Sequence, residues 1–82
     1  MNLSYYIGTC PFCDNQGRAF IVKEISTKQL LVLCEECDTV WDSPQKFLQN
    51  DPNIAKTQNG NRIEDVNFEE IKKEGWDIFI KQ

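Results

Sequence analysis

The sequence predicts one small α+β domain over residues 1–82, built on a β-hairpin that joins two cysteine-containing turns. Three observations lead to this fold class. A chain of 82 residues makes one domain at most and buries only a thin core. A Cys-x2-Cys pair stands on each side of an apolar stretch, and capping signals for two short helices follow only in the second half. Residues 5–42 should therefore form the hairpin unit, and residues 43–82 should form a helical and strand extension packed on it.

The first half of the chain reads as strands. Leu3 to Ile7 is short, apolar and aromatic, which indicates a first strand. Ala19 to Ile25 is rich in β-branched and aromatic residues, and Leu30 to Leu33 is its return strand. The four polar residues 26–29 between them suit a hairpin loop. A short apolar step, Val40-Trp41, follows the second cysteine pair.

Two short helices are expected in the second half. Ser43 is an N-cap followed by a proline at the first helical position, so a helix should run from residue 44 to about residue 49. Residues 50–62 are polar and read as a loop. Asn67 should cap a second helix over residues 68–74, with Glu70 placed as in a capping box and Gly75 as the stop signal.

A closing strand is predicted at the C-terminal end. Trp76, Ile78 and Ile80 alternate with polar residues, which favours a half-buried strand over residues 76–81. Phe79 breaks this alternation. The three apolar side chains are expected to pack the tail back on the hairpin unit.

The four cysteines predict a metal site. Cys10 and Cys13 form one Cys-x2-Cys turn, here called the first knuckle, and Cys34 and Cys37 form the second knuckle. Two residues between cysteines let one turn aim both sulfurs at one point, and a hairpin of the expected length brings the two turns together. Four thiolates fill a tetrahedral zinc site and leave no position for water or substrate, so we expect one structural zinc ion. Iron in the same geometry, disulfides and buried thiols are the alternatives.

These turns resemble those of zinc-ribbon and rubredoxin-like proteins over residues 5–42. The resemblance rests on Cys10-Pro11-Phe12-Cys13 and on Cys34 to Cys37, and it implies a metal-bearing ribbon without implying a function. Families with this knuckle usually carry glycine after the second cysteine of each pair, whereas Asp14 and Asp38 stand there in this chain. Aspartate tolerates a left-handed backbone better than most residues, so the turn can form.

The layout is also similar to that of small bacterial immunity proteins that neutralise secreted toxins. The shared features are Trp41 shortly after the fourth cysteine, a short helix, and a Gly75-Trp76 segment near the C-terminal end. The resemblance implies a protein-binding role with a toxin as the partner.

Charge narrows the class of partner. The formal net charge is −4, and four thiolates around one divalent cation would lower it to about −6. Such a field repels phosphate backbones and anionic lipid and attracts basic protein surfaces. No stretch has the length and hydropathy of a membrane span, and Met1 to Tyr6 lacks the features of a signal peptide, so we expect a cytoplasmic protein.

Four acidic residues crowd the second knuckle and form the candidate partner-binding surface. They are Glu35, Glu36, Asp38 and Asp42. The simpler interpretation is a solvated turn, and the functional one is a docking face for a basic partner.

No pattern of catalytic residues accompanies the metal motif. The chain has no histidine, no glycine-rich phosphate loop and no nucleophile-elbow serine. We therefore expect a non-enzymatic, zinc-stabilised protein-binding module, with an immunity protein as the favoured form. The alternatives are a nucleic-acid-associated zinc ribbon in transcription or translation, and a rubredoxin-like redox protein.

Overall fold

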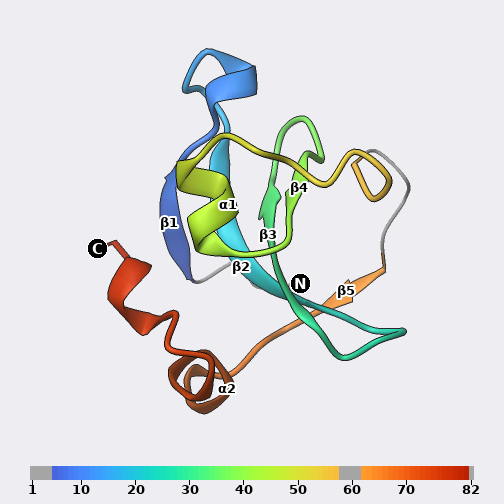
Figure 1. Ribbon diagram of the computed structural model, residues 1–82, viewed down its shortest axis with the longest axis vertical. Coiled ribbons are helices and arrows are strands. Elements are labelled where there is room, and N and C mark those ends of the chain that lie inside the picture. Colours follow the sequence, from blue (N-terminus) through green and yellow to red (C-terminus); the bar gives the residue numbers. More distant parts are fainter. Residues whose placement is uncertain (1–4, 58–61, 82) are drawn as a thin grey trace.

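The computed structural model describes residues 5–57 and 62–81, and its centre is an antiparallel sheet (Figure 1). The path of the sheet runs β1-β2-β3-β4, from β1 (Tyr6–Thr9) through β2 (Arg18–Glu24) and β3 (Leu30–Cys34) to β4 (Val40–Trp41). A two-residue strand, β5 (Ile63–Glu64), also pairs with β2. The prediction of a small α+β fold with a central hairpin is confirmed.

The β2–β3 hairpin places the two knuckles side by side. Its register pairs Ala19 with Cys34 at one end and Lys23 with Leu30 at the other. This pairing sets the second knuckle beside the start of β2, where the first knuckle ends. Both cysteine turns consequently lie at the same end of the molecule, at the top in Figure 1.

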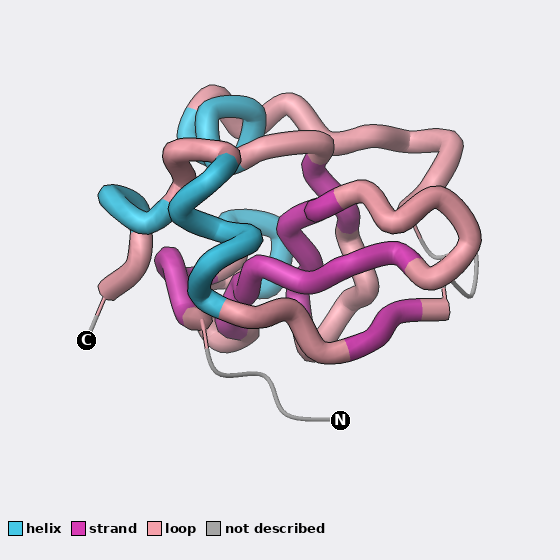
Figure 2. Tube along the Cα trace, turned by 90° about the horizontal axis from the view of Figure 1, so that it is seen from below, coloured by secondary structure: helices cyan, strands magenta, loops and turns pink. Residues whose placement is uncertain are grey.

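The sheet is buried on both faces, which explains why β2 is apolar without alternation. On one face the core includes Ile21, Val32 and Trp41, together with side chains from the helical segments. On the other face Phe20, Val22, Leu31 and Val40 form a second cluster. Successive strand residues point to opposite faces, so a strand covered on both sides needs apolar residues at every position. Figure 2 shows the helical segments gathered toward one side of the molecule and the hairpin toward the other.

The first strand lies further along the chain than its pattern suggests. β1 covers Tyr6–Thr9, and Leu3 lies outside the described residues. The strand runs to the residue before Cys10, and a bulge between Tyr6 and Gly8 interrupts its register with β2. β1 therefore leads directly into the first knuckle.

Both helices are confirmed with the predicted caps. In α1 (Pro44–Leu48) the Ser43 hydroxyl accepts a hydrogen bond from the backbone N–H of Lys46 at 3.2 Å. In α2 (Phe68–Lys73) the Asn67 side chain accepts from the backbone N–H of Glu70 at 2.8 Å. Gly75 stands just past α2 with a φ of 76°, the left-handed conformation that ends helices.

The predicted closing strand over residues 76–81 is wrong. The segment instead forms a 3-10 turn, η2 (Asp77–Phe79), in which Trp76 and Phe79 pack on the core while Ile78 is 79% exposed. A 3-10 turn places residues i and i+3 on one side, so it buries Trp76 together with Phe79, which a strand would separate. Phe79 interrupts the strand-like alternation in the sequence, and it lies three residues after Trp76, which is the spacing of a 3-10 turn. The tail still contacts the sheet, because the backbone N–H of Lys81 donates to the carbonyl of Tyr6 at 2.7 Å.

The polar stretch over residues 50–62 is partly ordered by local bonds. Residues 54–57 form a turn in which the Thr57 hydroxyl donates to the carbonyl of Asn53 at 2.8 Å, and residues 58–61 lie outside the described part. β5 follows the stretch and was not expected, because two residues are too few to show a period. No helix within the described residues combines the length and hydropathy needed to cross a bilayer.

Candidate metal centre

The first knuckle is a tight turn that β1 and β2 hold at both ends. Pro11–Cys13 forms a 3-10 turn, η1, that begins with proline, and the backbone N–H groups of Cys13 and Asn15 both donate to the carbonyl of Cys10. The Cys10 N–H in turn donates to the carbonyl of Gly17 at 2.8 Å. The chain leaves the turn through Asp14, whose φ of 52° is left-handed.

The second knuckle repeats this geometry after β3. The N–H of Asp38 donates to the carbonyl of Cys34 at 3.2 Å, and Asp38 has a left-handed φ of 59°. The N–H of Glu36 points at the Cys34 sulfur at 3.4 Å, as expected of an amide that stabilises a thiolate. Aspartate thus occupies in both turns the position that favours glycine, and the expected tolerance of this residue is confirmed.

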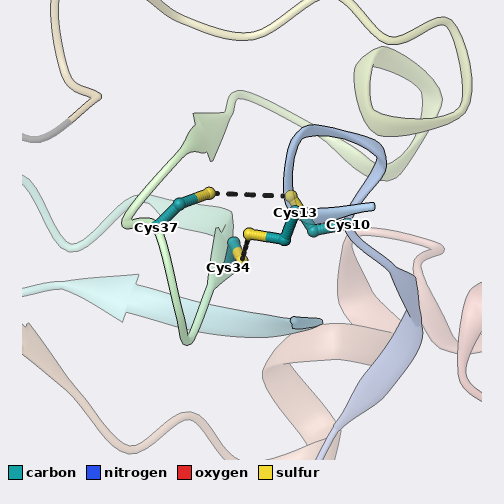
Figure 3. A group of neighbouring side chains, drawn as sticks. All are labelled: Cys10, Cys13, Cys34 and Cys37. Carbon is teal, nitrogen blue, oxygen red and sulfur yellow. Dashed lines mark hydrogen bonds between the residues drawn. The ribbon is translucent and has the colours of Figure 1, made fainter. Parts of the chain in front are cut away.

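The two knuckles bring all four sulfurs together (Figure 3). The four Sγ atoms lie within 4.8 Å of one another, and the Cys10–Cys37 and Cys13–Cys34 pairs are each 3.7 Å apart. Four sulfurs bound tetrahedrally at about 2.3 Å would be separated by about 3.8 Å. No disulfide joins the cysteines within the described residues. The cluster can therefore hold one metal ion with little rearrangement.

Burial and hydrogen bonds with neighbouring thiols oppose the ionisation of Cys10 and Cys13. Cys10 and Cys34 are fully buried, and burial raises the pKa of Cys10 far above its usual range. A hydrogen bond with Cys37, followed by burial, raises the pKa of Cys13 to about 11. Burial also disfavours the Cys37 thiolate, but hydrogen bonds from Thr39 and the neighbouring thiols outweigh it and lower the pKa of Cys37 to about 7. A bound cation would supply the charge that four thiolates require, and it would displace their protons.

Gly17 is a site residue that the sequence alone did not identify. A Cβ atom at this position would lie 2.7 Å from the Cys34 sulfur and 3.0 Å from the Cβ of Glu36. The backbone of the residue preceding β2 therefore passes directly against the second knuckle. The sequence shows only that a glycine follows the first cysteine pair by four residues. The register of the hairpin is needed to show that this glycine lies against the second knuckle.

The four predicted acidic residues do not form one uniform surface. Glu35 is paired with Arg18, whose Nε lies 3.0 Å from a Glu35 carboxylate oxygen. Asp42 accepts a hydrogen bond from the Asn53 amide at 2.9 Å and lines a separate hollow beside Leu30. Glu36 and Asp38 are exposed on the second knuckle itself.

Asp14 adds a third exposed carboxylate from the first knuckle. Among the described residues, none of Asp14, Glu36 and Asp38 has a cationic partner within salt-bridge distance. These three residues are called the acidic rim below. The rim differs from the predicted acidic surface because it includes Asp14 and leaves out Glu35 and Asp42.

Comparison with known protein families, with curated proteins and with solved structures finds no match to this chain. The assignment of the site consequently rests on its own geometry. Four cysteines from two turns cluster beside an antiparallel sheet, an arrangement compatible with a zinc-ribbon-like metal site.

Proposed function

We propose that the cysteine cluster binds one zinc ion whose role is structural. The observation that supports this most directly is the set of four converging sulfurs, two pairs of which already have the spacing of a tetrahedral site. An all-cysteine set fills every coordination position of zinc and leaves none for a substrate. Iron would fit the same four sulfurs, and elemental analysis and colour distinguish the two metals.

We further propose that the metal-held knuckles present their acidic rim to a basic surface of a partner protein, and that the chain is not an enzyme. The metal would fix both turns before the partner arrives, so that little conformational entropy is lost on binding. The net charge of −4, lowered further by metal binding, supports a basic partner and weighs against a nucleic acid.

The most specific form of this proposal is an immunity protein that neutralises a bacterial toxin in the cytoplasm. Its support is the acidity of the chain and the resemblance in layout. Two of the shared features, Trp41 and Trp76, are buried in the core. They therefore belong to the framework, and the acidic rim is the part that would meet the toxin.

The experiment compares two triple variants with the same change in charge. One carries Asp14→Asn, Glu36→Gln and Asp38→Asn, in which asparagine keeps the left-handed turns. The control carries Glu69→Gln, Glu74→Gln and Asp77→Asn, which remove three acids from the opposite end of the molecule.

Each zinc-loaded protein is used to capture partners from native lysate over a series of salt concentrations. The expected result is a basic protein that the wild type and the control retain and the rim variant loses, with retention falling as salt rises. Equal retention by both variants, or recovery of nucleic acid in place of protein, would contradict the proposal.

A further inference from the structure

An open apolar hollow of about 260 Å³ lies beside the second knuckle. Both knuckles and the 52–57 segment contribute to its wall. The lining residues are Phe12, Cys37, Thr39, Pro52, Ile54 and Thr57. One of the proposed metal ligands, Cys37, is thus part of the wall, so the hollow adjoins the candidate metal site.

Two contacts attach the wall of the hollow to β4. The Phe12 ring stacks on the buried Trp41 ring at a centroid distance of 6.3 Å. The Thr57 hydroxyl accepts from the backbone N–H of Val40 at 3.1 Å, which ties the 52–57 segment to β4. These contacts attach the Phe12 side of the hollow and the 52–57 segment to β4.

Two large apolar side chains of the wall are exposed to solvent. Phe12 is 53% exposed and Ile54 is 75% exposed. Pockets for drug-sized ligands usually enclose about 300–1,000 Å³, so a hollow of this size fits a single large side chain better than a whole small molecule.

The acidic rim stands next to this hollow along the chain. Asp38 lies between two wall residues, Cys37 and Thr39, and Glu36 precedes Cys37. On the first knuckle, Asp14 follows Phe12 by two residues. The backbone of Asp38 therefore borders the hollow, and none of the three rim carboxylates has a cationic partner among the described residues.

We propose that the hollow receives an apolar side chain of a partner protein, flanked in that partner by lysine or arginine residues that meet the acidic rim. The inference rests on the proposed function and specifies where and how the partner is recognised. The apolar anchor supplies the affinity of the contact, and the rim supplies its orientation and association rate.

The test uses a random peptide library panned against the zinc-loaded 82-residue chain, followed by titration calorimetry with the enriched peptides. The expected peptides carry one aromatic or large aliphatic residue next to lysine or arginine. Ile54→Ser removes one of the two exposed apolar side chains of the wall. Ile78→Ser is the matched control, because Ile78 is similarly exposed at 79% and is not among the residues that line the hollow.

We expect Ile54→Ser to weaken peptide binding about tenfold or more, and Ile78→Ser to leave it unchanged. Zinc content and the cobalt(II) absorption spectrum should stay the same in both variants, which excludes unfolding as the cause. Basic peptides that bind both variants equally would overturn the role of the hollow and leave the acidic protein-binding surface standing. Enrichment of acidic or uncharged sequences would overturn both proposals.

Discussion

The backbone at Gly17 approaches the metal site so closely that adding one methyl group should disturb it. In Gly17→Ala the new Cβ would lie 2.7 Å from the Cys34 sulfur, whereas ordinary contacts between heavy atoms fall near 3.5–4.0 Å. Neither the Cys34 sulfur nor the Gly17 backbone can move away easily. The sulfur is fixed once a metal binds it, and the Gly17 carbonyl accepts the hydrogen bond from Cys10 that closes the first knuckle.

Overpacking of this kind usually costs about 1–3 kcal/mol. Because the strain falls on a metal ligand, we expect zinc affinity to drop by about 5- to 150-fold, measured by competition with a chromophoric chelator. The cobalt(II)-substituted protein should also show a shifted absorption spectrum, since the new methyl group displaces one sulfur from its place in the tetrahedron.

Gly75→Ala is the matched control. Its φ of 76° strains any other residue, but within the described residues no heavy atom beyond its chain neighbours lies within 4 Å of the new Cβ. Gly75 stands just past α2, which lies at the other end of the molecule from the knuckles. It should cost about 1 kcal/mol of folding free energy and leave the cobalt spectrum unchanged. A Gly17→Ala protein with the wild-type spectrum and affinity would refute the close approach.

Three further predictions concern the framework around the site, each measured by urea unfolding of the zinc-loaded protein at pH 7. Asp38→Gly should keep or raise the stability, and Asp38→Val should lower it by about 1–2 kcal/mol, because the left-handed turn penalises a β-branched residue. Trp41→Ala should cost about 3–5 kcal/mol, and Trp41→Phe much less, because the indole N–H has no hydrogen-bond partner within the described residues. Hydrogen bonds from Thr27 and Lys56 hold the pKa of Glu24 below its usual range in the folded protein. The ionised carboxylate therefore contributes its full stabilisation above the pKa of the unfolded chain, about 4.3, and this stabilisation is lost as the pH falls through the pKa of the folded protein. At pH 7, Glu24→Gln should therefore cost about 1–3 kcal/mol.

The cysteine cluster and the hairpin could be predicted because local signals determine them. The spacing of the cysteines sets each knuckle, and the apolar run before Ser26 with the polar break after Ile25 sets the hairpin. The helix caps at Ser43 and Asn67 are equally local, since each side chain bonds a backbone group three residues away.

The features that could not be predicted depend on contacts between distant segments. The tail over residues 76–81 alternates like a strand, but its conformation follows from burying Trp76 and Phe79 together on the core. Pairing of β5 with β2 depends on where residues 62–64 arrive after a long polar stretch. The acidic surface was predicted from closeness in sequence, which could not show that Arg18 pairs with Glu35 across the hairpin.

The free energy of zinc binding is as large as the folding free energy of a domain of this size, so removing the metal should unfold the protein. Natural domains have a folding free energy of about 0.05–0.15 kcal/mol per residue, or about 4–12 kcal/mol for a chain of 82 residues. Structural zinc binding in model peptides contributes about 10–16 kcal/mol. If the site is structural, its metal supplies as much free energy as the whole fold requires, and Cys34→Ser should unfold or aggregate.

Structural zinc in the cysteine cluster is tested most directly by elemental analysis of the protein purified without chelator, combined with circular dichroism before and after treatment with a strong chelator. We expect one zinc ion per chain, a colourless protein, and loss of the folded spectrum when the metal is removed. A protein without bound metal, a coloured iron protein, or a spectrum unchanged by the chelator would contradict it.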